Sequence, residues 1–263
     1  MCPANGVGRV PRYTKDGGAT WADVPDLPPT NWIVSNLFNT RIVAADRVNI
    51  GTFYIYNFGT PGLYRTTDGG DSTALIYSGH ITPTSNGGNF QMRAAPGNAG
   101  DLWFTTGEVD GSGHPYPTGL FKRGRVAEDG TVTLETIADV LEVRTFGFGR
   151  SRNGVGYVVY IVGWVTGIYG IWRSEDYGAS WEQIGDFPNG NFDYPKCING
   201  DMNVFRQAYV GFSGTGFAYL EGNPELHIAP PSGAEVIWPG SSRKKSKRQG
   251  PDIGLIRELQ RQW

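Results

Sequence analysis

Hydrophobic residues recur along the chain in short runs of about five, and glycine-rich polar turns separate the runs. Four runs have the aliphatic and aromatic content of buried strands, at 52–56, 101–105, 157–161 and 208–212. Each is too short for a helix, and an amphipathic helix-like pattern is confined to the tail at 253–263. The pattern predicts an all-β fold of short strands joined by tight turns.

A turn motif of the form Ser/Thr-x-Asp-x-Gly-x-x-Trp follows these strand-like runs. It is clearest at 174–181 around Asp176, is repeated in full around Asp16, and is repeated around Asp68 with a final threonine. Asp16 and Asp68 lie 52 residues apart, and Asp68 and Asp176 lie 108 apart, which is two periods with a degenerate copy at 119–130 between them. A period near 50 residues is typical of β-propeller blades.

This motif is the Asp box of BNR-type repeats, and its chemistry is that of a turn. A short aspartate side chain accepts backbone N–H groups across a hairpin, glycine supplies a positive φ, and tryptophan packs between sheets. We therefore expect Asp16, Asp68 and Asp176 to be structural rather than catalytic.

The repeat divides the chain into a blade region, 1–222, and a tail, 223–263. Three nearly whole units cover about 32–78, 88–140 and 141–187, and a partial unit covers 201–222. The first box begins too early to be preceded by two inner strands of its own blade, so we expect the sequence to start within a blade. Either the units form an arc of a larger ring, or the N-terminal hairpin closes a small four-bladed ring. We favour the arc.

The tail is rich in proline and carries a basic run at 243–248. Such a run can bind nucleic acid, but no aromatic residues are interleaved in it and the chain as a whole has a net charge of −2. We interpret it as a solvated segment. With 18% charged residues the chain has no field that would recruit nucleic acid or an anionic membrane, so a neutral partner fits better.

Cysteine and histidine usage predicts no metal, nucleotide or other cofactor. Cys2 and Cys197 are too few for a disulfide scaffold or a thiolate cage, although one long-range disulfide is compatible with them. The three histidines, His80, His114 and His227, lack ligand spacing. The N-terminus lacks the features of a secretory signal, and no apolar run reaches the roughly 20 residues of a membrane span.

The blade sequences resemble glycoside hydrolase family 74, which comprises xyloglucanases and oligoxyloglucan reducing-end-specific cellobiohydrolases. Four segments carry the resemblance, in the family's order: VAADRVNIGTFY at 43–54, FQMRAAPG with GDLW at 90–103, FGFG at 146–149, and NGD with AYVGFSGTG at 199–216. They extend the similarity over roughly 8–222, whereas an Asp box alone is shared with sialidases and other propellers. The resemblance implies part of an arc of a seven-bladed propeller.

The same resemblance implies a function. Family members place two propellers across an open cleft, where an aspartate acid and an aspartate base hydrolyse xyloglucan with inversion. No segment here matches either catalytic motif, since Gly200-Asp201 lies in the context of a closing blade. We therefore assign no catalytic residue and expect this chain to contribute cleft and sugar-binding surface. The resemblance also implies an extracellular location. The missing inner strands before Thr14 would leave an unpaired blade edge, so we expect a missing N-terminal propeller part or self-association as protein partners.

Exposed aromatic rings are the candidate contacts for xyloglucan or a related β-glucan oligosaccharide. Five rings close boxes or occupy a repeated slot and are expected to pack between blades: Trp21, Trp181, Tyr64, Phe121 and Trp172. Trp103 is expected in the core. Trp164 is expected in a loop at 163–167, Tyr116 lies in the long connection 107–118 with Glu108, Asp110 and His114, and Phe192 and Tyr194 precede the last blade. These four, Trp164, Tyr116, Phe192 and Tyr194, are the candidate sugar-binding residues.

Two alternatives remain beside the enzyme portion. A non-catalytic carbohydrate-binding or scaffold propeller would keep the blades without an acid–base pair. A sialidase would need clustered arginines, for which Arg93, Arg144 and Arg206 are available, but no sequence segment supports that function.

Overall fold

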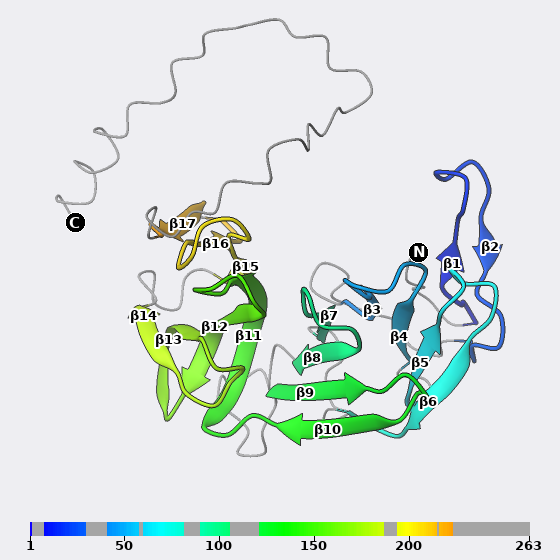
Figure 1. Cartoon of the computed structure of the whole chain (residues 1–263), viewed down its shortest axis with the longest axis horizontal. Helices are drawn as coiled ribbons and strands as arrows, with labels where there is room; N and C mark the ends of the chain where they lie inside the picture. Colours follow the sequence, from blue (N-terminus) through cyan, green and yellow to red (C-terminus); the bar gives the residue numbers. More distant parts are fainter. Residues whose placement is uncertain are drawn as a thin grey trace, which may run out of the picture. The chain divides into compact units, whose positions relative to one another are not determined.

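The computed structural model describes residues 1, 8–29, 41–57, 60–81, 90–105, 121–186, 194–214 and 216–222, all within the unit Met1–Ile228. Over these ranges the regular elements are strands, as the hydrophobic pattern predicts (Figure 1). They form antiparallel sheets in which neighbouring strands follow chain order. No helix in this part of the chain is long and apolar enough to cross a membrane.

Three of the five sheets have four strands each, and the first and fifth have two and three strands in the described residues. The strands of the first sheet are β1 (Arg12–Tyr13) and β2 (Ala22–Asp23); of the second, β3 (Val43–Ala45), β4 (Phe53–Asn57), β5 (Gly62–Thr66) and β6 (Ala74–Ser78); of the third, β7 (Gln91–Ala94), β8 (Asp101–Thr105), β9 (Phe121–Val126) and β10 (Val132–Thr136); of the fourth, β11 (Val140–Arg150), β12 (Tyr157–Val165), β13 (Ile168–Ser174) and β14 (Glu182–Gly185); and of the fifth, β15 (Pro195–Gly200), β16 (Ala208–Phe212) and β17 (Phe217–Leu220).

The four strands predicted from the hydrophobic runs are the second strands of these sheets, β4, β8, β12 and β16. Two boundaries differ from the expectation. Strand β12 continues to Val165 because its apolar run is uninterrupted, so Trp164 is a strand residue and not a loop residue. The last sheet begins at Pro195 rather than near 201, because the polar-looking segment 195–200 pairs with β16 as its first strand.

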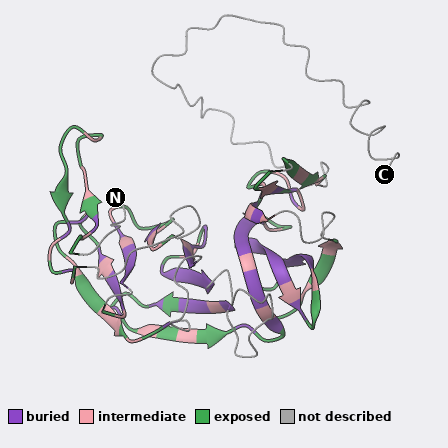
Figure 2. Ribbon diagram, turned by 180° about the vertical axis from the view of Figure 1, so that it is seen from behind, coloured by how far each residue is buried: buried purple, intermediate pink, exposed green. Residues whose placement is uncertain are grey.

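Burial falls from the inner to the outer strands, which explains the sequence pattern of each. The second strand β8 is buried at every position, whereas the fourth strands β6, β10 and β14 have no fully buried residue (Figure 2). A strand covered on both faces reads as a continuous apolar run, and a half-exposed one alternates. This is why the sequence indicated the second strands and missed the fourth.

The first strands β3, β7, β11 and β15 lie side by side in parallel. Arg41, just before β3, forms a parallel bridge with Gln91 of β7, whose side-chain amide donates to the Arg144 carbonyl of β11 (3.2 Å). Strands β11 and β15 approach closely at the glycines of the FGFG segment, since a Cβ on Gly147 would lie 2.0 Å from the Ile198 carbonyl oxygen. The glycines of this family-like segment therefore permit the contact between two sheets.

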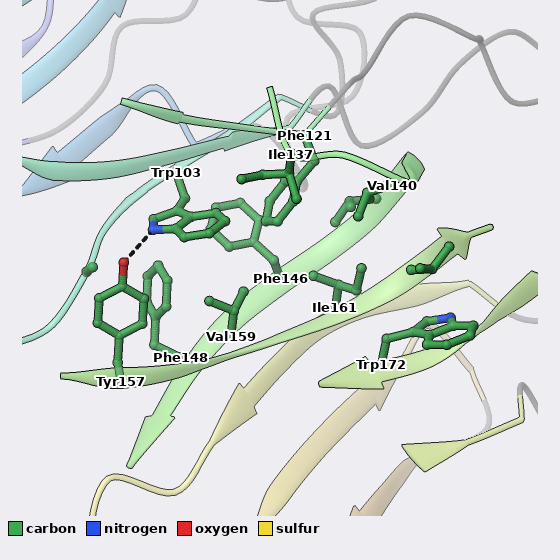
Figure 3. Close-up of a cluster of buried hydrophobic side chains, with 13 residues drawn as sticks. Trp103, Phe121, Ile137, Val140, Phe146, Phe148, Tyr157, Val159, Ile161 and Trp172 are labelled. Atoms are coloured by element: carbon green, nitrogen blue, oxygen red, sulfur yellow. Dashed lines mark hydrogen bonds between the residues drawn. The ribbon is translucent and has the colours of Figure 1, made fainter. Parts of the chain in front are cut away.

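The largest core cluster lies between the third and fourth sheets (Figure 3). Trp103 is fully buried and packs 5.1 Å from Phe121, centroid to centroid, and its indole N–H donates to the Tyr157 hydroxyl (2.8 Å). Phe121 and Trp172 are buried, and Trp181 packs against Phe121. Aromatic pairs of this kind add about 0.5–1.5 kcal/mol each beyond the area that they bury.

The three box aspartates have the same set of hydrogen bonds. Asp176 accepts from the Ser174 hydroxyl (2.8 Å) and from the backbone N–H and hydroxyl of Ser180 (2.8 and 2.6 Å). Asp68 accepts the corresponding bonds from Thr66 and Ser72, and Asp16 from Thr14 and Thr20. A carboxylate with three donors across one turn fixes that turn between the third and fourth strands.

The boxes also contact the neighbouring sheet. Gly70 of the second box lies against the Tyr13 ring, and a Cβ there would approach the ring within 2.7 Å. Tyr13 and Lys15 of the first box both bind the Asp71 carboxylate of the second. Trp21 does not pack as expected: its side chain is 41% exposed and its indole donates to the Gly18 carbonyl of its own turn. Its sheet has only two strands in the described part of the chain, which leaves the ring without a face to cover.

We propose that the box aspartates stabilise the fold in a pH-dependent manner. Burial opposes ionisation of Asp176, but the bonds from Ser180 and Ser174 outweigh it and lower the pKa of the carboxyl. A carboxyl with a lowered folded-state pKa stabilises the protein above its unfolded value near 3.9, and this stabilisation is lost as the pH falls through the folded pKa. Asp176→Asn should therefore lower the free energy of unfolding by about 1 kcal/mol at pH 7, and the difference should shrink below about pH 4.

Urea unfolding at pH 7 and pH 3 measures this difference. Asp129→Asn is the matched control, because Asp129 in the degenerate copy is exposed and receives its backbone bond from Thr131 alone in the described part of the chain (2.8 Å), so it should contribute less. Equal destabilisation by the two variants, or a difference for Asp176→Asn that does not change with pH, would contradict the proposed role.

Candidate functional site

Each sheet has two ends with different contents. The end that carries the box turns between third and fourth strands is called the box end here, and the other is called the opposite end. Because the first strands are parallel neighbours, the opposite ends of successive sheets lie on the same side. Trp164 and Tyr194 are both at the opposite end, away from the box aspartates.

Trp164 is the penultimate residue of β12, just before the two-residue turn to β13. It is opposite Tyr169 of β13 and Glu142 of β11, and the Trp164 and Tyr169 rings are 5.4 Å apart, centroid to centroid. Both side chains are partly exposed. The turn is held by a bond from the Thr166 N–H to the Asp139 carbonyl (2.8 Å). Two adjacent aromatic rings on a rigid hairpin therefore present a surface on which a sugar ring can stack.

A buried ion pair lies beside this hairpin, on the neighbouring strand β11. Glu142 is fully buried and its carboxylate pairs with Arg144 (2.5 Å), whose side chain is 14% exposed. Arg144 donates in turn to the Tyr194 hydroxyl, and its guanidinium lies 5.0 Å from the Tyr194 ring centroid. A charge pair in this position is costly to break, so it fixes Tyr194 relative to β11.

Tyr194 is thereby brought to the same end as Trp164 but in a different environment. Lys196 lies 5.2 Å from the Tyr194 ring centroid in addition to Arg144, so cations already contact that ring.

The phenol of Tyr169, beside Trp164, is neutral. Burial raises the pKa of Tyr169 to about 12, so this phenol stays a neutral donor and acceptor at physiological pH. The ring pair Trp164 and Tyr169 is thus the better stacking surface, and Tyr194 the better polar contact.

The remaining candidates lie outside the described residues. This holds for Tyr116, Phe192 and the connection 107–118 with Glu108, Asp110 and His114, so they stay sequence-based predictions. The three arginines that a sialidase would require do not converge: Arg93 binds Asn199, Arg144 pairs with Glu142, and Arg206 pairs with Glu175. Within the described ranges no group of histidine, cysteine and acidic residues could hold a metal ion. Cys197 is a free cysteine.

Sequence reasoning did not assign three residues to this surface: Glu142 and Tyr169, which it did not single out, and Arg144, which it considered only for a sialidase site. Two weak signals were available. A charged residue inside an otherwise apolar run such as Val140–Arg150 needs a buried partner, and Arg144 is the nearest opposite charge in the run, two residues away in sequence. Tyr169 follows a Thr-Gly turn, which places it opposite Trp164 in a tight hairpin.

Comparison with known proteins identifies relatives of the chain. The chain is 29% identical over 233 residues to a xyloglucanase of a Paenibacillus species, 27% identical over 248 residues to xyloglucanase Xgh74A of Acetivibrio thermocellus, and 28% identical over 226 residues to a probable oligoxyloglucan-reducing end-specific xyloglucanase of Neosartorya fischeri. These matches cover 88%, 94% and 83% of the chain and 20%, 26% and 24% of the respective relatives. No family model matches the chain.

Solved structures give the same relationship. A family 74 enzyme of Niastella koreensis superposes with a TM-score of 0.59 at 26% identity, over 83% of this chain and 28% of that one. The family 74 xyloglucanase of Xanthomonas campestris gives 0.59 at 27% identity, over 79% and 26%. The chain is related to the family 74 glycoside hydrolases.

This relationship confirms the all-β fold similar to family 74 propellers that the sequence predicted. The family 74-related chain spans about a quarter of the length of the relatives that it matches. Two of the segments on which the sequence resemblance rests have structural roles here: the glycines of the FGFG run let β11 and β15 approach, and the GDLW run supplies Trp103 to the core.

Proposed function

We propose that this chain forms part of the second propeller of a xyloglucan-hydrolysing glycosidase and supplies sugar-binding surface rather than the acid–base pair. The observation that carries the proposal is the Trp164–Tyr169 ring pair at the opposite end, beside the Glu142–Arg144–Tyr194 cluster. Its relatives in Paenibacillus and Acetivibrio thermocellus are xyloglucanases, which supports xyloglucan as the ligand. In the family such an enzyme acts with inversion on a β-1,4-glucan backbone.

The geometry suits a neutral polysaccharide. Apolar faces of pyranose rings stack on aromatic side chains, and their hydroxyls bind phenols and charged groups held by the protein. Glu142 is buried and ion-paired, so it is a positioning residue and not a base for water. The described part of this surface is thus equipped to bind and orient a chain, not to transfer protons.

A non-catalytic carbohydrate-binding propeller remains the second candidate, because it would use the same ring pair. Both functions require sugar binding at Trp164 and differ only in hydrolysis by the whole protein. An extracellular location is part of the first proposal, since the polysaccharide is a cell-wall component outside the cell.

Binding of xyloglucan oligosaccharides tests the shared step. Trp164→Ala is expected to weaken the affinity for the oligosaccharide at least about tenfold in isothermal titration calorimetry. The reason is that burying the indole face under a sugar ring is worth about 1.5–3 kcal/mol. The matched control is Trp21→Ala, another partly exposed tryptophan, which is at a box turn and should leave affinity unchanged.

Circular dichroism and the melting temperature of both variants show whether the fold is intact. Unchanged affinity in a folded Trp164→Ala variant, or an equal loss in Trp21→Ala, would refute the assignment of the ring pair as the sugar platform.

A further inference from the structure

A second concave region lies along the first strands, apart from the ring pair. It has a volume of about 490 Å³ and is lined by residues of β3, β7, β11 and β15 and of their following turns. We call it the basin. Three of its lining residues are arginines, Arg41, Arg47 and Arg93, and much of the remainder is apolar, including Met92 and Phe148.

The basin has no acidic residue among its lining residues. Two aspartates are neighbours in sequence of basin residues, but the carboxylate of each accepts backbone hydrogen bonds within its own turn. Asp46 accepts from the N–H groups of Val48 and Asn49 (both 2.8 Å), and Asp201 accepts from Asn203 (2.7 Å). Neither carboxylate is ion-paired with a basin arginine in the described part of the chain, so the positive charge of the basin is not compensated there.

Arg93 shows most clearly that the positive charge of the basin is not compensated. Its Nη1 donates to the Asn199 side-chain oxygen (2.6 Å), whereas its Nε and Nη2 are buried and make no hydrogen bond to described residues. Burial, and then the charge of Arg41, lower the pKa of Arg93 to about 9. Buried cations in proteins are normally paired, and an unpaired guanidinium attracts an anion strongly because little solvent screens it.

We propose that the basin binds the carboxylate of a small organic acid, such as an acidic sugar. Arg41 and Arg47 are exposed and can make direct charge-assisted hydrogen bonds, and Arg93 supplies uncompensated charge in the floor. The apolar lining favours an organic body beside a single charge over a strongly hydrated inorganic anion. This site is independent of the proposed binding of a neutral polysaccharide at Trp164.

Glucuronate and glucose form a matched pair of probes, because they differ only in a carboxylate at the sixth carbon. At constant ionic strength, sodium glucuronate is expected to raise the melting temperature of the 263-residue chain and to bind in calorimetry, whereas glucose should do neither. Arg93→Met should weaken glucuronate binding at least about tenfold, since the uncompensated positive charge in the floor of the basin is lost. Arg125→Met, an exposed arginine of β9 outside the basin, should leave binding unchanged.

Several outcomes would overturn the proposal. These are equal binding of glucose and glucuronate, equal loss of binding in Arg125→Met, and inorganic phosphate binding as tightly as glucuronate. If Arg93→Met does not fold, Arg41→Met gives the same test from the exposed side of the basin. Xyloglucan oligosaccharide binding should be unaffected by Arg93→Met, so failure here leaves the proposal for Trp164 standing.

Discussion

Replacing Arg123 by methionine is expected to lower the free energy of unfolding by about 3–5 kcal/mol, because it would leave a buried carboxylate unpaired. Arg123 and Asp101 are 5% and 4% exposed. Their side chains form two bonds, Nε to Oδ1 (2.8 Å) and Nη2 to Oδ2 (2.5 Å). This two-point geometry is the strongest form of the pair, and the Tyr157 hydroxyl adds a third bond to the same carboxylate (2.6 Å).

The pair connects two sheets and a box. Asp101 and Arg123 lie on β8 and β9, Tyr157 begins β12, and the Arg123 guanidinium lies 4.9 Å from the ring centroid of Tyr177 in the third box. Burial alone would lower the pKa of Arg123, but the bond to Asp101 outweighs it and the pKa is raised. Tyr157 has its pKa raised by burial and then by the Asp101 charge, so its phenol remains a donor.

Urea unfolding measures the effect, with Arg125→Met as the control. Arg125 is two residues further along the same strand and exposed, so its removal should change stability by less than about 0.5 kcal/mol. The double variant Asp101→Asn with Arg123→Met should be less destabilised than the sum of the two single variants, since the charge left behind is removed. A loss below about 1 kcal/mol for Arg123→Met would show that the pair is not what holds these sheets together.

This network shows where sequence reasoning stopped. The run 101–105 was predicted as a strand from its apolar content, and Trp103 was predicted to be core, as the structure shows. The partner of Asp101 could not be predicted, because Arg123 lies 22 residues away and Tyr157 belongs to another sheet. Periodicity fixes which side of a strand a residue occupies, but not which sheet packs against it.

The candidate surface was predictable to a similar extent. Trp164 was chosen because a large ring seemed to lack a partner in a loop, yet it lies in a strand and is paired with Tyr169. The predicted element was wrong, although Trp164 does lie beside a turn, because Thr166 and Gly167 follow directly after β12. Trp21 was expected to pack because it closes a box, and it is exposed because its sheet has two strands in the described residues. The box motif thus predicts its own turn, whereas the packing of its closing ring depends on the neighbouring sheet, as Trp181 and Trp21 show.

The second large effect concerns hydrolysis. We expect the 263-residue chain to release reducing sugar from xyloglucan far more slowly than a full-length family 74 xyloglucanase, because no segment matches either catalytic aspartate motif of the family. Loss of a positioned acid or base costs about 10²–10⁴-fold for each proton transfer. An inverting glycosidase needs both groups about 6.5–9.5 Å apart around the scissile bond, and the ion-paired Glu142 does not offer a free carboxylate for either role.

A colorimetric reducing-sugar assay on xyloglucan, with binding measured in parallel, distinguishes the two candidate functions. Binding without hydrolysis is expected of this chain, and addition of the remaining propeller parts of a relative should restore hydrolysis if the chain is an enzyme portion. Rates within about tenfold of a full-length relative would contradict the prediction. The first suspect would then be the exposed Asp139, whose carbonyl anchors the hairpin beside Trp164, and the next would be Glu108 and Asp110, which lie outside the described residues. Asp139→Asn would identify the first of these, because it removes the acid while the backbone bond to Thr166 is retained.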